Sequence, residues 1–244
     1  MKSGHYLEDY QNYVKKKLRG MSRDKAMAQS IGGEFVGFGK MLRDLVFQRG
    51  LPLDGFLIDV GCGSGRLANA LRDFPELRYT GTDVVQDLLD YAQELVDRPD
   101  WKFKRSIDLT IPERDDSADM VCFFSVFTHL LHEETFVYLQ EAKRVLKPGG
   151  RITFSYLDFT QPHHWAVFQG NLATVRNRDH LNMFIDKAAI PVWARHLGLD
   201  VVGIWDGAVP HIELSEDITL DDGRVFSGHA TLGQSVCVLE KPAA

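Results

Sequence analysis

One glycine-rich segment, residues 58–66 (IDVGCGSGR), constrains the fold of this chain more than any other part of it. Ile58 and Val60 indicate the end of a buried strand, and the spacing of Leu67 and Leu71 predicts a helix directly after the turn. Glycine permits positive φ and close approach of the backbone, and the first N–H groups of a helix face a bound ligand. A strand, a glycine turn and a helix in this order predict a nucleotide-binding pocket.

The spacing of the glycines indicates which nucleotide would bind. Dinucleotide folds use G-x-G-x-x-G to seat a pyrophosphate, whereas Gly61, Gly63 and Gly65 follow the pattern G-x-G-x-G. Asp59 precedes the turn, and its carboxylate would repel a phosphate but suit a ligand that carries an ammonium group. These two features argue against a nicotinamide-dependent dehydrogenase.

A second carboxylate, Asp83, ends a predicted strand over residues 79–83 and follows Gly65 by 18 positions. An acidic residue about 20 positions beyond the glycine turn commonly binds the ribose in nucleotide-binding α/β folds. A carboxylate accepts two hydroxyl hydrogen bonds at once, which suits a vicinal diol. The alternative role for Asp83 is a helix N-cap, because Asp is favoured there and a helical pattern follows.

Together these segments resemble the cofactor motifs of the class I S-adenosylmethionine (SAM) methyltransferases. The apolar run at 118–125 is similar to the fourth strand of that family, and residues 146–150 (LKPGG) are similar to the turn before its fifth strand, 151–157. The resemblance covers residues 55–157 closely. It implies an α/β, doubly wound, mainly parallel seven-stranded sheet with an antiparallel edge strand, plus an N-terminal helical lid and a small extra β-hairpin.

The same resemblance implies SAM as the cofactor, S-adenosylhomocysteine as the product, and a set of contacts. The glycine turn would wrap the methionine half, and Asp108 would meet the adenine amino group with Ile107 or Leu109 beside the ring. Asp108 could equally be an ordinary loop residue. The predicted cofactor contacts are Asp59, Gly61, Cys62, Gly63, Gly65, Arg66, Asp83, Val84, Ile107, Asp108, Leu109, Phe124 and Ser125.

Methyl transfer needs few protein groups, because the sulfonium already makes the methyl electrophilic. The enzyme must align the acceptor, exclude water and take a proton from an O–H, N–H or C–H acceptor. Histidine is the side chain best suited to this near neutral pH, and by resemblance His129, just after the fourth strand, has the best position. We predict His129 as the catalytic base, with local packing at a helix start as its alternative role.

Aromatic and histidine residues outside the core predict where the acceptor binds. Tyrosines at helical spacing near the N-terminus indicate either a lid over the site or an amphipathic helix packed on the domain. The connection between the fifth strand and residue 186 is long, and long connections are usually functional or mobile. The predicted acceptor contacts are Tyr6, Tyr10, His163, Trp165 and His180. For the histidines His163 and His180, as for His164, a place on the loop surface is the favoured alternative.

The 244 residues are predicted to form one methyltransferase domain. Residues 1–50 would form its helical cap, 51–157 the SAM-binding core, and 158–244 the substrate side and the last strands. A hairpin turn is expected at 221–224.

Two strands near the C-terminus, at 201–205 and 235–240, would pair antiparallel at the sheet edge, as they do in the family. A helix over about 187–197 would begin at Asp186 and end at Gly198.

Composition narrows the choice of partners. The net charge of −6 argues against a nucleic-acid grip, and the three cysteines and nine histidines show no metal-ligand spacing, so no metal is predicted. The sequence shows neither a signal-like apolar core nor a membrane-length apolar stretch. These features predict a cytoplasmic protein with a small-molecule acceptor, no nucleic-acid or membrane partner, and a possible homodimer.

Two function classes remain open at this stage. The first is a SAM-dependent methyltransferase that moves a methyl group to an O, N or C nucleophile of a small molecule by in-line SN2 displacement. The second is a fold relative that binds SAM without methyl transfer, either as a binding module or as a catalyst of other SAM chemistry. A missing base and an open pocket would favour the second.

Overall fold

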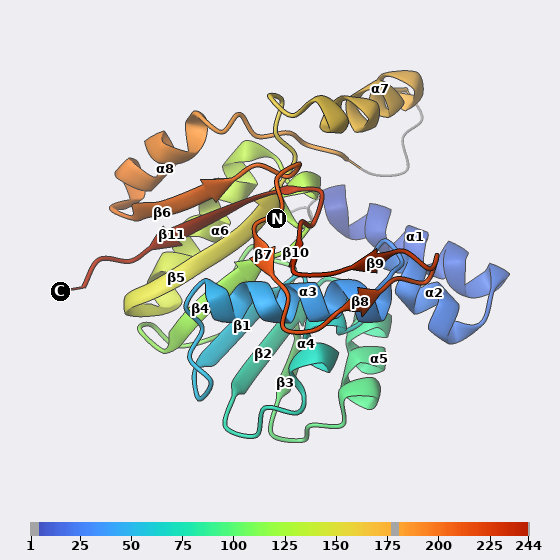
Figure 1. Cartoon of the computed structure of the whole chain (residues 1–244), viewed down its shortest axis with the longest axis horizontal. Coiled ribbons are helices and arrows are strands. Elements are labelled where there is room, and N and C mark those ends of the chain that lie inside the picture. Colours follow the sequence, from blue (N-terminus) through green and yellow to red (C-terminus); the bar gives the residue numbers. More distant parts are fainter. Residues whose placement is uncertain (1–4, 177–180, 244) are drawn as a thin grey trace.

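The sheet at the centre of the molecule has seven strands in the order β3-β2-β1-β4-β5-β11-β6 (Figure 1). In this computed structural model, residues 5–176 and 181–243 are described, with side chains from residue 10 onward. The strands of the sheet are β1 (Phe56–Val60), β2 (Arg78–Asp83), β3 (Lys102–Arg105), β4 (Ala118–Phe123), β5 (Leu146–Tyr156), β6 (Asp200–Trp205) and β11 (Ser235–Glu240). This architecture confirms the predicted α/β fold with a mainly parallel sheet.

The antiparallel strand is β11, which pairs with both β5 and β6. It lies next to the edge strand β6, so the predicted antiparallel pairing of the last two strands at the sheet edge is confirmed. Five of the six residues of β11 are buried, which suits an interior strand covered on both faces. Strand β5 begins at Leu146 rather than at residue 151, because Leu146 already pairs with Ala118 of β4.

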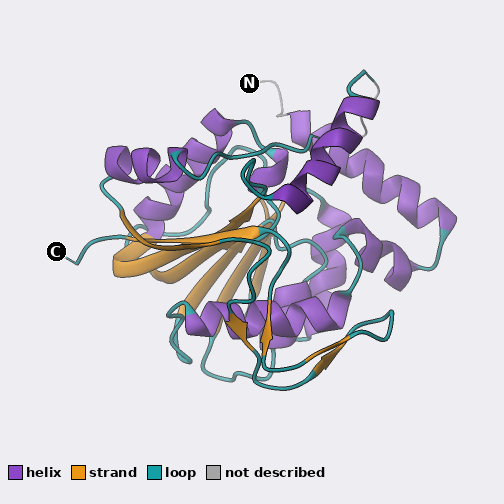
Figure 2. Ribbon diagram, turned by 45° about the horizontal axis from the view of Figure 1, so that its top comes forward, coloured by secondary structure: helices purple, strands orange, loops and turns teal. Residues whose placement is uncertain are grey.

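Helices cover both faces of the sheet (Figure 2) because its central strands are apolar on both sides. In β1, Leu57 packs into a cluster with helix residues such as Leu45 and Leu71, while the next residue, Ile58, packs into a second cluster with Leu139. The helices on the first face are α3 (Phe35–Gln48), α4 (Arg66–Leu71) and α5 (Gln86–Val96), and those on the other are α6 (His132–Val145) and α8 (Ala189–Leu197).

Helix α8 starts two residues later than predicted. Its N-cap is Ala188, and Asp186 acts from outside the helix by accepting the backbone N–H of Ala188 at 2.8 Å. The helix ends as predicted at Gly198, which adopts a left-handed conformation.

The N-terminal segment lies over the end of β2. Helix α1 (His5–Gly20) is followed by α2 (Arg23–Ser30), which the sequence analysis missed because the segment lacks an apolar stripe. Val14 of α1 and Met27 of α2 pack against Val85 and Leu88 at the start of α5. This packing places α1 near the carboxyl ends of the strands.

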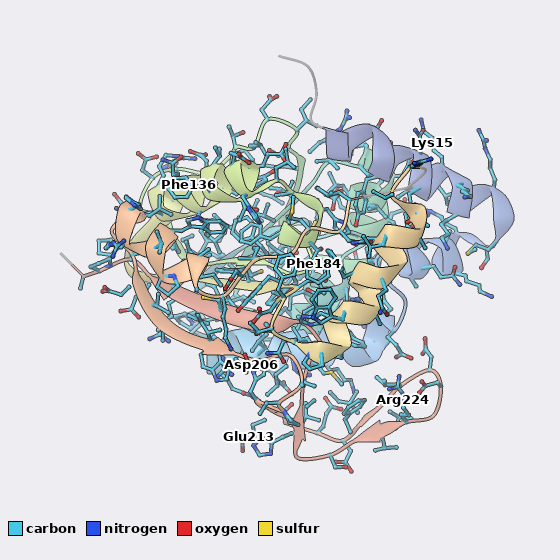
Figure 3. All side chains as sticks on the ribbon, turned by 90° about the horizontal axis from the view of Figure 1, so that it is seen from above. Lys15, Phe136, Phe184, Asp206, Glu213 and Arg224 are labelled. Carbon is cyan, nitrogen blue, oxygen red and sulfur yellow. The ribbon has the colours of Figure 1, made fainter. Side chains whose placement is uncertain are left out.

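The segment between β5 and α8 contains η2 (Pro162–His164) and helix α7 (Trp165–Thr174), which stands apart from the sheet in Figure 1. No side chain of α7 is buried. Phe184, labelled in Figure 3, ties this segment down by packing against Phe159 and Phe168 at ring-centroid distances of 5.0 and 5.6 Å.

Two small antiparallel pairs separate β6 from β11. One is the hairpin of β8 (Ile218–Thr219) and β9 (Val225–Phe226), whose turn falls at the predicted residues 221–224. The other pair, β7 (Ile212–Glu213) with β10 (His229–Ala230), was not predicted. Both pairs pack against Met41 of α3.

Candidate functional site

A cavity of about 450 Å³ opens at the carboxyl ends of the central strands. Its walls come from the turn after β1, the ends of β2 and β4, helix α1, and the loop before β11. Ligands bind in this position in open parallel sheets, because the loops that follow the strands surround it. Predicted cofactor contacts that line the cavity are Asp59, Gly61, Cys62, Gly63, Arg66, Asp83, Val84, Phe124 and Ser125.

The turn after β1 requires glycine for two reasons. Gly61, Gly63 and Gly65 have φ values of 74°, 56° and 85°, which other residues rarely adopt. A Cβ on Gly63 would also lie 2.5 Å from the Ile31 side chain, and a Cβ on Gly65 would lie 2.8 Å from Cβ of Ala92. Gly65 therefore shapes the turn from behind, and it is not itself among the residues that line the cavity.

Asp83 joins the glycine turn to the start of α5. One carboxylate oxygen accepts the backbone N–H of Gly63 at 3.0 Å, and the other accepts that of Val85 at 2.9 Å. The N-cap position of α5 is occupied by Val85, so Asp83 is not the cap. Burial raises the pKa of Asp83, and its backbone hydrogen bonds oppose this rise. A carboxylate has about four acceptor positions, so two remain for hydroxyl groups of a ligand.

Asp59 is held within the sheet. Its side chain accepts hydrogen bonds from the Tyr79 hydroxyl at 2.8 Å and from the Cys122 thiol at 3.4 Å. The residue is 3% exposed, and burial raises its pKa to about 6. The predicted contact between Asp59 and an ammonium group therefore remains a prediction, while the structure shows Asp59 tying β1 to its two neighbours.

Arg66 fastens the N-terminal segment onto the glycine turn. Its Nη2 donates to the backbone carbonyls of Ile31 and Gly33. Burial lowers the pKa of Arg66 to about 10. Its buried Nε has no hydrogen-bond partner among the described residues. A buried donor without a partner is costly, so this atom is suited to an anionic ligand group in the cavity.

The segment after β3 contributes less than predicted. Ser106 lines the cavity, but Ile107, Asp108 and Leu109 are not among the lining residues. Asp108 is exposed, and Leu109 has a φ of 53°. The predicted contacts of these three residues with adenine remain predictions.

His129 lies in the short helix η1 (Phe127–His129), at the cavity wall. Its Nδ1 is 2.7 Å from the carbonyl oxygen of Leu181. Because a carbonyl can only accept, Nδ1 carries the proton, and Nε2 is the basic nitrogen of the neutral ring. The edge of the Tyr10 ring packs on the imidazole at a centroid distance of 5.1 Å.

Tyr10 also lines the cavity, as predicted for an acceptor contact. Burial and the charge of Asp83 raise its pKa, so the phenol stays neutral. Tyr13, one turn further along α1, lines the cavity as well. The helical spacing of the N-terminal tyrosines predicted a lid or a packed helix, but Tyr13 was not among the predicted acceptor contacts.

The remaining predicted acceptor contacts lie apart from the cavity or outside the described residues. His163 Nε2 is 2.8 Å from the carbonyl oxygen of Gly233, and Trp165 donates to the carbonyl of Phe159 at 3.1 Å while remaining 45% exposed. Neither is among the lining residues. His180 and the side chain of Tyr6 are not described.

Metal-binding clusters, membrane-spanning helices and disulfides are all absent from the described residues. No cluster of three or more His, Cys, Asp or Glu side chains is placed to hold a metal ion. No helix there has the length and apolar character needed to cross a membrane. The cysteines Cys62, Cys122 and Cys237 are buried and form no disulfide with one another.

Comparisons with known proteins agree with this geometry. Residues 58–154 match a family model described as a methyltransferase domain. The chain is 33% identical over 155 residues to the malonyl-[acyl-carrier protein] O-methyltransferase of Hahella chejuensis. The aligned region covers 62% of this chain and 52% of that protein. The chain is 23% identical over 216 residues to the 27-O-demethylrifamycin SV methyltransferase of Amycolatopsis mediterranei, which covers 76% and 77% of the two chains.

The chain therefore spans about half the length of the first relative and about three quarters of the second. Among solved structures, it resembles the Haloferax volcanii protein solved in complex with the Trm112 methyltransferase activator. That match has a TM-score of 0.65 at 20% identity and covers 95% of this chain and 98% of the other. These matches agree with the predicted resemblance and confirm the predicted fold.

Proposed function

We propose that this chain, whose residues 58–154 match a methyltransferase-domain model, moves a methyl group from SAM to an O, N or C nucleophile of a small molecule by in-line displacement. The observation that carries this proposal is the composition of one cavity. It brings the glycine turn and Asp83 together with His129 and Tyr10, which are far apart in sequence.

The residues present fit SAM. The Nε of Arg66 needs an acceptor, and the cofactor carries a carboxylate. Asp83 has acceptor positions for a ribose diol, and Gly61 and Gly63 line the cavity, so the backbone of the turn faces the ligand. When bound, SAM supplies a methyl group that its sulfonium makes electrophilic.

The other half of the cavity would handle the acceptor. His129 would take the acceptor proton on Nε2, and the Leu181 carbonyl would hold the ring in the required tautomer and stabilise the imidazolium that forms. Tyr10 and Tyr13 would exclude water. Alignment contributes about 7–11 kcal/mol in favourable cases, and a general base adds about 10²–10⁴-fold.

Two features support a small acceptor. The two curated relatives are named for an acyl group on a carrier protein and for a rifamycin, and the net charge of −6 does not suit a nucleic-acid surface. We therefore keep a cytoplasmic enzyme without nucleic-acid partners, acting alone or as a homodimer, as part of the proposal.

The test has two steps. Calorimetry with S-adenosylhomocysteine should show binding, while NADH should not bind. Incubation with methyl-tritiated SAM and separate small-molecule, protein and RNA fractions should then label the small molecules. If S-adenosylhomocysteine binds but no fraction receives the methyl group, the result would support a fold relative that binds SAM without methyl transfer. If NADH binds and S-adenosylhomocysteine does not, the whole proposal is rejected.

A further inference from the structure

A ring of three polar side chains lies on the side of the cavity formed by β4, β5 and the loop before β11. The backbone N–H of Ser125 donates to Oγ of Ser155 at 2.8 Å. The Ser155 hydroxyl donates to Oε1 of Gln234 at 2.7 Å, and Nε2 of Gln234 donates to Oγ of Ser125 at 3.2 Å. All three residues line the cavity. The sequence analysis assigned only Ser125, and assigned it to the cofactor.

The hydrogen bonds of this ring run in one direction. Ser155 is 1% exposed, so its hydroxyl proton needs an acceptor inside the protein. Since Ser155 already accepts the Ser125 N–H, its proton goes to Gln234 Oε1, and this orients the amide with Nε2 toward Ser125. Oγ of Ser125 accepts there, so its own proton points elsewhere, and the described residues offer it no acceptor.

The ring therefore presents donors to the cavity. The first is the hydroxyl of Ser125, and the second is the remaining N–H of the Gln234 amide, because an NH₂ group has two donors. Each acceptor oxygen of the three side chains already accepts one hydrogen bond within the ring, whereas these two donors have no acceptor within it. A ligand group that accepts hydrogen bonds is therefore favoured at this place.

The backbone of Ser125 supports a binding role. Its φ is 59°, in the left-handed region that serine rarely adopts. Such conformations persist where surrounding structure holds them, and they cluster at ligand sites. Here the Ser125 N–H is held by Ser155, and the Ser125 carbonyl accepts the Thr128 hydroxyl at 2.9 Å.

Among the described residues, carboxylates line the cavity on the side of β1 and β2 but not on the side of β4 and β5. Its carboxylates are Asp59 and Asp83, which lie at the ends of β1 and β2. The described lining residues from β4, β5 and the loop before β11 include neither carboxylates nor Lys or Arg. An anion beside Ser125 and Gln234 would therefore not meet a neighbouring negative side chain.

We infer that Ser125 and Gln234 anchor the methyl acceptor by an sp² oxygen, from a carboxylate or a carbonyl group, with Ser155 as the residue that positions them. This inference rests on the proposed function and names its substrate class. The acceptor carries such an oxygen together with a separate nucleophile, whose proton His129 takes. Gln234 then decides specificity. It accepts the proton of the buried Ser155 hydroxyl and, through its amide, leaves one N–H and the Ser125 hydroxyl as donors that face the cavity.

The experiment compares four small probes on enzyme saturated with S-adenosylhomocysteine. Benzoate presents a carboxylate, acetophenone a carbonyl, benzylamine a cationic donor, and toluene only the ring. We expect benzoate and acetophenone to bind the wild type more tightly than toluene. Gln234→Glu replaces the donors by an anion at almost unchanged volume, so it should weaken benzoate binding about tenfold or more and strengthen benzylamine binding.

Controls separate this inference from the proposed function and from misfolding. Gln140→Glu makes the same change on the exposed face of α6 and should leave all four probes unaffected. Ser125→Ala removes one donor without adding charge and should weaken benzoate binding by a smaller factor. Calorimetry with S-adenosylhomocysteine comes first for every variant.

Failure of the wild type to bind that nucleoside would reject the proposed function and this inference with it. Normal nucleoside binding with equal benzoate affinity in the wild type and in Gln234→Glu, or benzoate binding no tighter than toluene, would overturn this inference alone.

Discussion

The two halves of the cavity are built in different ways. The half at β1 and β2 comes from two short segments, in which Asp83 accepts backbone N–H groups of Gly63 and Val85. The half at β4 and β5 is assembled from four distant segments, namely α1, η1, β5 and the loop before β11. The first half depends on backbone geometry that only certain residues permit, whereas the second depends on side chains that tertiary packing brings together. We therefore expect substitutions to separate cofactor binding from turnover.

The largest effect should come from the acceptor half. His129→Ala should lower turnover by about 10²–10⁴-fold, because it removes the group that takes the acceptor proton. Affinity for S-adenosylhomocysteine should stay within a few fold of the wild type. Steady-state kinetics and calorimetry give the two numbers, and His196→Ala, at an exposed position on α8, is the control. Full turnover in His129→Ala would remove this residue as the base.

The next effect concerns the backbone of the cofactor half. Gly65→Ala would place a Cβ 3.1 Å from the Ala92 backbone at a φ of 85°. We expect it to lower the free energy of unfolding by about 2–4 kcal/mol and to weaken nucleoside binding. Gly170→Ala is the matched control, because a Cβ there meets no atom within 4 Å. In the interior of α7 it should stabilise by about 0.5–1 kcal/mol. Equal stability of the two variants in urea unfolding would contradict the claim that the turn requires glycine.

Asp59 offers a pH-dependent test of the same half. Burial raises the pKa of Asp59 from its usual 3.8 to about 6. The folded state therefore binds a proton more tightly than the unfolded state, and ionisation between pH 4 and 7 costs about 2–3 kcal/mol of stability. Asp59→Asn removes this titration, so the stability of the wild type relative to the variant should fall by that amount as the pH rises.

Urea unfolding at pH 4 and pH 7 measures this change. Asp73→Asn is the control, because the Asp73 side chain is 92% exposed and should add no difference between the two pH values. A constant difference between the wild type and Asp59→Asn would show that Asp59 does not titrate with a raised pKa.

The smallest of these effects is the loss of one ligand contact. Asp83→Ala should weaken binding of S-adenosylhomocysteine by about one to two orders of magnitude, the range of a hydrogen bond to a charged group. Turnover at saturating SAM should fall much less than in His129→Ala. Asp73→Ala serves as the exposed control, and unchanged nucleoside affinity in Asp83→Ala would reject the ribose role.

The same contrast explains how far the sequence could predict the site. The strand, the glycine turn and Asp83 were predictable, because their geometry is set by residues close in the chain and by φ values that demand glycine. The mainly parallel seven-stranded sheet and the antiparallel pairing of its last two strands followed from the resemblance, and the structure confirms both.

The acceptor half was predicted poorly for a physical reason. Gln234 carries no local signal, and it reaches Ser125 only because β11 inserts beside β5. His163 and Trp165 have the residue types expected of a binding site, but their side chains are engaged with the backbone carbonyls of Gly233 and Phe159. Residue type alone could not show whether such a side chain lines the cavity or is engaged by the backbone elsewhere.

A crystal structure of the protein with S-adenosylhomocysteine tests the division of the cavity most directly. We predict the ribose hydroxyls on Asp83, the carboxylate near Nε of Arg66, and the sulfur directed toward the half that holds His129 and Ser125. Ribose density against the β4 and β5 side, or a nucleoside bound outside this cavity, would contradict the account.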